Sequence, residues 1–168
     1  METKGEGMKK AFTMIELVMV IVILGVLSSV AISKMALTRD DAIITKGRSQ
    51  VSSIRSAISL LRSKNMMSGK MSNGGYPPFL DDEHVNHDGK LFDGNSSIGK
   101  LLDYPVYDKA PAGQDIDGNW EKDASNQYHY TAMKKNVTFK YIPSTGVFDC
   151  NHSSSDAKIK ELCKSLTE

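Results

Sequence analysis

A single carboxylate, Glu16, lies within an otherwise apolar segment that runs from Ala11 to Leu24 near the N-terminus of this 168-residue chain. A charge placed in hydrocarbon costs about 2.5–3.5 kcal/mol on insertion scales, so such a residue usually has a specific partner. The chemistry that Glu16 predicts is therefore ion pairing with a cation in an apolar setting.

The two cysteines, Cys150 and Cys163, lie near the C-terminus and enclose a short polar loop. Their spacing suits a disulfide better than a metal site. A bridge would close a loop of roughly fourteen residues and contribute about 3 kcal/mol in the chain-entropy model. Disulfides persist in oxidising compartments, so an oxidised pair would place this half of the chain outside the cytosol.

Two aspartates, Asp115 and Asp117, could supply oxygen ligands to calcium. An EF-hand is excluded, because Trp120 stands where that motif needs glycine and Asn126 stands where it needs glutamate. Another kind of calcium loop stays open. A separate acidic run at 81–83 is interpreted as a solvated turn.

No catalytic constellation stands out. The serine run at 153–155 has no nucleophile-elbow context, and there is no glycine motif for phosphate. His84 and His87 lack a third ligand at metal-site spacing and are interpreted as incidental. With 21 Lys and Arg against 20 Asp and Glu, the net charge of +1 gives no footprint for nucleic acid, and the basic residues at 134, 135 and 140 are interpreted as solvated strand positions. We expect no enzyme, no nucleic-acid partner and no cofactor beyond the open calcium question.

The apolar segment over 12–33 is long enough to cross a bilayer as a helix. A secretory signal peptide is the alternative, with Lys9 and Lys10 as its basic region. The apolar run exceeds the usual core of such peptides, roughly 7–15 residues, and a signal peptide has no use for Glu16. Lysines and arginines flank the segment on both sides, so they assign no orientation.

The remaining chain predicts an α+β head over 34–168. An amphipathic helix is expected over 34–66, followed by a loop over 67–120 rich in Gly, Pro, Asp and Asn, and then by a sheet and disulfide loop over 121–168. The helix carries one apolar stripe, formed by Leu37, Ile44, Val51, Ile54, Ile58 and Leu61. Three short antiparallel strands are expected between 127 and 148, with one face covered by this stripe.

The segment from Lys9 to Leu17 resembles the class III leader junction of type IV pilins and type II secretion pseudopilins. It combines a short basic leader, a small residue, Phe-Thr, a glutamate at the fifth position after the junction and a long apolar helix. Ala11 stands where glycine is usual, and Ser33 stands where many members have a helix-kinking proline. The leader covers residues 1–11 if translation starts at Met1, and about four residues if it starts at Met8.

The resemblance implies that a prepilin peptidase cuts between Ala11 and Phe12 and methylates the new amine of Phe12. Glu16 of one subunit would then pair with the Phe12 amine of a neighbour in apolar surroundings, which satisfies both charges. Stacked helices would make head-to-tail contacts that propagate into a filament.

The implied partners are further copies of this chain, other pilins or pseudopilins, and an inner-membrane assembly platform. The implied location is the bacterial inner membrane with the head in the periplasm, and later a periplasmic or surface filament. The acidic, turn-rich loop after Tyr76 and Pro77 loosely resembles that of major type II pseudopilins, which favours a pseudopilus over a type IV or competence pilus. The alternative is a membrane-anchored periplasmic binding protein that does not polymerise.

Overall fold

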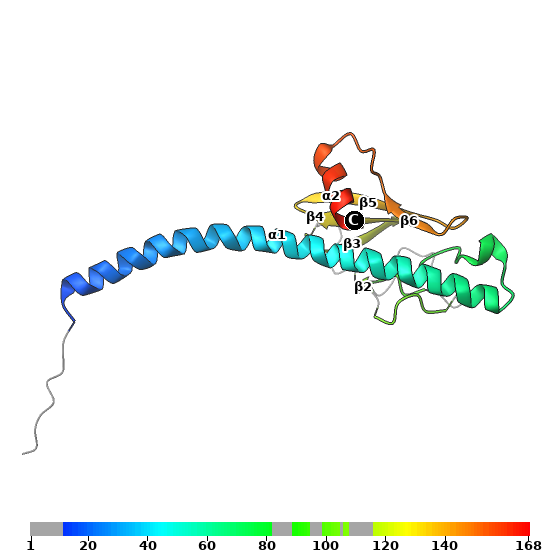
Figure 1. Ribbon diagram of the computed structural model, residues 1–168, viewed down its shortest axis with the longest axis horizontal. Coiled ribbons are helices and arrows are strands. Elements are labelled where there is room, and N and C mark those ends of the chain that lie inside the picture. Colours follow the sequence, from blue (N-terminus) through cyan, green and yellow to red (C-terminus); the bar gives the residue numbers. More distant parts are fainter. Residues whose placement is uncertain (1–11, 82–88, 95–98, 105, 108–115) are drawn as a thin grey trace, which may run out of the picture. The chain divides into compact units, whose positions relative to one another are not determined.

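The computed structural model describes residues 12–81, 89–94, 99–104, 106–107 and 116–168. It forms two units, Met1–Arg39 and Asp40–Glu168. The elements, shown in Figure 1, are α1 (Met14–Met67), a 3₁₀ turn (Ser72–Gly75), β1 (Lys90–Leu91), β2 (Val106–Tyr107), β3 (Trp120–Ala124), β4 (Gln127–Ala132), β5 (Lys135–Ile142), β6 (Val147–Cys150) and α2 (Ala157–Thr167). The predicted α+β order, helix first and sheet after, is confirmed.

The first unit is helical from Met14, as the sequence predicts. Its large apolar side chains are exposed, from Phe12 at 84% to Leu27 at 61%. None of the helices in the part of the chain that the structure describes combines the length and mean hydropathy expected of a membrane span. The transmembrane assignment of 12–33 therefore stays a prediction.

The second unit contains the core, and the apolar stripe of α1 forms one side of it. Val51, Ile54, Ile58 and Leu61 are buried, so the predicted helical periodicity is confirmed over these positions. The helix ends at Met67, where Gly69 adopts a φ of 72°. Glycine accepts this left-handed conformation at no steric cost, which lets the chain turn back at the helix terminus.

The main sheet has the order β3-β4-β5-β6, and all its neighbours are antiparallel (Figure 1). Alternate residues on one face are aromatic and fully buried, as the period of two in β5 predicts. These residues are Trp120, Tyr128, Tyr130, Phe139, Tyr141 and Phe148. Phe92 packs on this layer from the loop after β1, with its ring centroid 4.5 Å from that of Tyr128. The core is therefore a layer of aromatic rings between α1 and the sheet.

One prediction about the sheet, its number of strands, is wrong. The sheet has a fourth strand, β3, which precedes the three strands expected between 127 and 148. This edge strand pairs with β4 and carries charged residues beside Trp120, so it lacks the apolar alternation of a central strand. The disulfide between Cys150 and Cys163 is present, and the second half of the loop that it closes belongs to α2, which contains Cys163. The Asp156 carboxylate caps this helix by accepting from the N–H groups of Lys158 and Ile159.

Candidate functional site

Thr13 and Glu16 form the first turn of α1. The Thr13 N–H and hydroxyl donate to Oε2 of Glu16 at 2.9 and 2.8 Å. The Glu16 N–H donates in return to the Thr13 hydroxyl at 3.3 Å. This is a capping box, in which two donors at a helix start are satisfied reciprocally. Both side-chain bonds reach Oε2, so neither occupies the second carboxylate oxygen, Oε1.

The predicted processing point adjoins this turn. Phe12 directly precedes the capping residue and is 84% exposed. Ala11 lies outside the described residues, so the cleavage point remains a prediction. The role of Thr13 was missed in the sequence analysis, although the Thr-x-x-Glu pattern before an apolar run is a known signature of a helix start.

The helix surface that follows Glu16 is apolar and uncovered. Val18, Ile21 and Leu24 are each about half exposed, at 48%, 58% and 55%. The hydroxyls of Ser28 and Ser29 donate hydrogen bonds to backbone carbonyls of the same helix, so these two polar groups do not interrupt the apolar surface with unsatisfied donors. Contiguous exposed apolar surface of this size marks contact with a membrane or another protein.

Cys150 and Cys163 form a disulfide with their Cα atoms 5.9 Å apart. It joins the last residue of β6 to the middle of α2. Arg55 of α1 lies beside this junction and donates to the Phe148 carbonyl at 3.0 Å and to the Asp149 carboxylate at 2.9 Å. The disulfide thus attaches α2 to the end of β6, and the hydrogen bonds from Arg55 attach the same end of β6 to α1.

A buried ion pair joins Asp81, which follows the 3₁₀ turn, to Lys122 of β3. Lys122 contacts Asp81 at 2.7 Å, and both side chains are at most 7% exposed. The hydroxyl of Tyr128 is also buried, and burial together with the nearby Asp81 charge raises the pKa of Tyr128 above its ordinary value. The interpretation of Asp81 as part of a solvated turn is therefore wrong, while residues 82 and 83 lie outside the described part of the chain.

The structure does not test the predicted calcium site. Asp117 is half-buried, and its Oδ1 accepts the N–H of Lys134 at 2.8 Å. This bond connects Asp117, which precedes β3, to the turn between β4 and β5. Asp115 lies outside the described residues, as do His84 and His87, so calcium at Asp115 and Asp117 stays a prediction.

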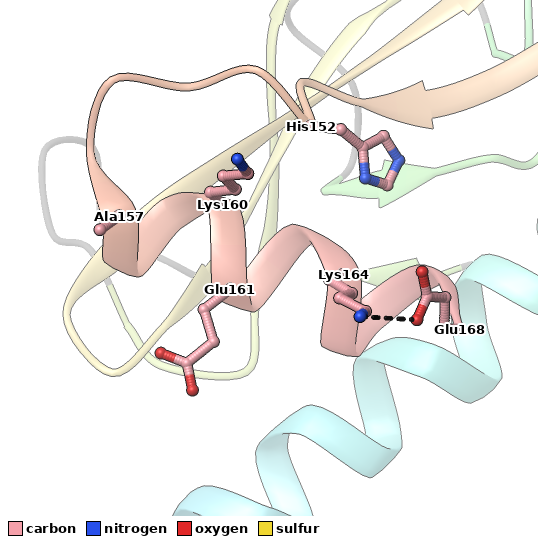
Figure 2. Close-up of a pocket in the computed structure, with 6 residues that line it drawn as sticks. All are labelled: His152, Ala157, Lys160, Glu161, Lys164 and Glu168. Carbon is pink, nitrogen blue, oxygen red and sulfur yellow. Dashed lines mark ion pairs between the residues drawn. The ribbon is translucent and has the colours of Figure 1, made fainter.

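The exposed side of α2 has a shallow hollow of about 440 Å³, drawn in Figure 2. His152 lines it from the loop after β6. The other lining residues are Ala157, Lys160, Glu161 and Lys164 of α2 and Glu168, which follows the helix. Lys164 and Glu168 lie 3.6 Å apart as an ion pair. The residues drawn there do not form a nucleophile with a base, so the hollow does not present a catalytic arrangement.

The comparison with family models gives one finding at the N-terminus. The model of the prokaryotic N-terminal methylation motif matches residues 7–32, which include the predicted cut, Thr13, Glu16 and the exposed apolar helix. No curated protein and no solved structure matches the chain significantly. The motif confirms the resemblance stated on the residues from Lys9 to Leu17: the chain carries the prokaryotic N-terminal methylation motif, the hallmark of type IV pilin and pseudopilin precursors.

Proposed function

We propose that this chain is a structural subunit of a pilin-like filament. It is made as a precursor, cut between Ala11 and Phe12, methylated on the Phe12 amine and polymerised through the first half of α1. The methylation motif at 7–32 supports the processing steps. The head acts as a structural module in this proposal, not as an enzyme.

Glu16 is the observation that carries the proposal. Cleavage creates a cationic amine at Phe12, four positions before this carboxylate. In apolar surroundings each charge is unfavourable without a partner. The capping box holds the Glu16 side chain at the N-terminal turn and leaves Oε1 for a donor from another chain. Pairing with the Phe12 amine of a neighbouring subunit would set the axial register of a head-to-tail assembly.

The exposed apolar surface after Glu16 needs cover in both states of the protein. Lipid would cover it in a membrane-anchored precursor, and helices of neighbouring subunits would cover it in the filament. The disulfide between Cys150 and Cys163 suits a head in the oxidising periplasm. Among filament types we favour a type II pseudopilus, because of the acidic, turn-rich sequence that follows Tyr76 and Pro77.

Mass spectrometry of the native protein tests the processing step. We expect an N-terminal peptide that begins with N-methylated Phe12. An intact start at Met1 or Met8 in the mature protein would contradict the filament proposal and would support a membrane-anchored binding protein instead.

Two substitutions at Glu16 test the pairing step separately from helix capping. Glutamine can still complete a capping box but carries no charge, whereas alanine loses both functions. We therefore expect Glu16→Gln and Glu16→Ala to be processed normally, and both to give far fewer filaments in sheared-filament yields. Normal yield from Glu16→Gln would show that the residue acts as a cap and that no ion pair is needed.

A further inference from the structure

The loop after β6 carries an acceptor pattern for an N-linked sugar. Asn151, His152 and Ser153 form an Asn-x-Ser triplet, the pattern that sugar transferases recognise in surface loops of exported proteins. The same pattern, with Ser or Thr as its third residue, occurs at 95–97 and at 136–138. The triplet at 95–97 lies outside the described residues. A pattern this short also arises by chance, so the structural setting of each triplet has to decide whether a transferase can use it.

The triplet at Asn151 lies on the surface. All three of its residues are exposed, and the side chain of His152 is 47% exposed. They follow β6 directly and precede α2, and Figure 2 shows His152 on this loop. A transferase could therefore bind the triplet without displacing any residue of the core.

The side chain of Asn151 is oriented by its own triplet. The Ser153 N–H donates to Oδ1 of Asn151 at 2.9 Å, which makes an Asx turn. Among the residues that the structure describes, no hydrogen bond engages Nδ2 of Asn151. The oxygen of this amide is thus occupied within the turn, while the nitrogen, which is the atom that accepts a sugar, is left for one.

Both ends of the loop are fixed to the head. Cys150, directly before the triplet, is bridged to Cys163 of α2. Asp156, at the other end, caps α2 and pairs with Lys135 of β5 at 2.9 Å. A sugar on Asn151 would therefore project from an anchored turn and would not require the neighbouring elements to move.

The triplet that begins at Asn136 has the opposite setting. Asn136 lies on β5, is half-buried and pairs with Thr131 of β4, whose hydroxyl donates to its Oδ1 at 2.8 Å. The next residue, Val137, is 1% exposed. A transferase would have to separate β5 from β4 to bind this segment. We therefore expect Asn136 to stay unmodified, which makes it an internal control.

We propose that Asn151 is an N-glycosylation site of the exported head. The inference rests on the proposed function, because it requires the head to face the periplasm. The co-substrate is an oligosaccharide carried on a lipid diphosphate. A glycan is bulky and hydrophilic, so it would cover the turn beside the disulfide and keep this part of the surface soluble.

The transfer exchanges one bond for another. A bond forms between Nδ2 of Asn151 and the anomeric carbon of the sugar, and the bond from that carbon to the diphosphate oxygen breaks. The lipid diphosphate leaves with the electron pair, and Nδ2 gives up one proton. No oxidation or reduction is involved.

Peptide mapping of the native full chain tests the site. After reduction and alkylation, trypsin yields the peptide 141–158, which contains Asn151, and the peptide 136–140, which contains Asn136. Electron-transfer fragmentation keeps a glycan on its side chain and locates it. We expect the glycan mass on Asn151 and an unmodified peptide 136–140.

The N-terminal peptide of the same digest reports separately on processing. An unmodified peptide 141–158 in chains that begin with N-methylated Phe12 would overturn the glycosylation site and leave the proposed function standing. A glycan on Asn151 in mature chains that begin at Met1 or Met8 would contradict the filament and support the glycosylation site.

Four variants separate the acceptor asparagine from the serines beside it. Asn151→Gln and Ser153→Ala each destroy the triplet, so we expect complete loss of the glycan mass from both. Ser153→Thr keeps the pattern and Asn136→Gln leaves the turn unchanged, so both are expected to carry the full glycan mass. Mapping of the disulfide between Cys150 and Cys163 checks that each variant has folded. A glycan that persists in Asn151→Gln would lie on a serine and would overturn the proposal.

Discussion

Thr13 and Glu16 exchange hydrogen bonds around the first turn of α1, at 2.9 Å from the Thr13 N–H to Glu16 Oε2 and at 3.3 Å from the Glu16 N–H to the Thr13 hydroxyl. The carboxylate expected to recognise a neighbouring subunit is therefore positioned by a residue of its own chain. Thr13 is a positioning residue in the proposed assembly.

Substitution of Thr13 is expected to lower filament yield without removing any charge. Thr13→Val keeps the shape but loses the hydroxyl cap, and loss of such a cap costs about 0.5–2 kcal/mol of helix stability. Thr13→Ser keeps the hydroxyl and serves as the control. Filament yield and N-terminal mass would be measured together. A capping effect on assembly lowers the filament yield while the N-terminal mass still shows correct processing. Equal yields from the two variants would show that the cap plays no part in assembly.

The fold was predictable where one periodicity dominates a segment. The apolar stripe through Val51, Ile54 and Ile58 identified the buried face of α1, and alternation in β5 identified the inner face of the sheet. Helix α2 was not predicted, because the segment between the cysteines at 150 and 163 is short and polar, which is typical of a loop. Yet its buried residues, Leu162, Cys163 and Leu166, follow helical spacing after a capping aspartate.

The pairing of Asp81 with Lys122 could not be predicted from the residues around either of them. Asp81 stands in an acidic, turn-rich context that is typical of solvent exposure, and its partner Lys122 is 41 positions away on an edge strand. Tertiary packing alone brings these two residues together. At the N-terminus the opposite holds, because Thr13 and Glu16 are three residues apart and their interaction follows from a local pattern.

Removal of one member of the Asp81–Lys122 pair is expected to destabilise the head strongly. Asp81→Leu leaves the Lys122 ammonium buried without its carboxylate, which typically costs about 3–5 kcal/mol. Lys122→Met conversely leaves the Asp81 carboxylate buried without the Lys122 ammonium. The double variant removes both charges and is expected to recover most of the loss. Free energies of unfolding from urea titrations of the four proteins would measure the coupling, and additive effects of the two substitutions would contradict it.

A matched pair of glycines in α1 tests the close packing of the second unit. A Cβ at Gly47 would lie 2.6 Å from side-chain atoms of Leu166 and Tyr130, whose hydroxyl donates to the Ile43 carbonyl at 2.7 Å. Overpacking of this kind typically costs about 1–3 kcal/mol, so Gly47→Ala is expected to lower the melting temperature.

Gly25→Ala is the control, because no atom lies within 4 Å of its added Cβ. Alanine also favours a helix over glycine by about 0.8–1.0 kcal/mol. The melting temperature of Gly25→Ala is therefore expected to stay the same or to rise. A similar loss in both variants would show that the contact at Gly47 does not explain the effect.

The N-terminus of α2 is expected to loosen in acid through Asp156. Its pKa is held below the ordinary value, first by the hydrogen bond from Lys135 and then by the N–H groups of Ile159 and Lys158. Because the folded pKa is lowered, the folded chain binds this proton less readily than the unfolded chain. The stabilisation is complete above the unfolded value of 3.8 and is lost as the pH falls below it, through the lower folded value.

Asp156→Asn separates this titration from the cap itself. Asparagine is about as good an N-cap as aspartate but carries no charge, so α2 in the variant should keep its cap while losing the ion pair with Lys135, 2.9 Å away in the wild type. We expect hydrogen-exchange protection at the start of α2 to fall in the wild type as the pH is lowered below 3.8, and to change much less in the variant. A parallel decline in both proteins would assign the acid response to another group, because the Asp156 carboxylate is the only titrating group that differs between them.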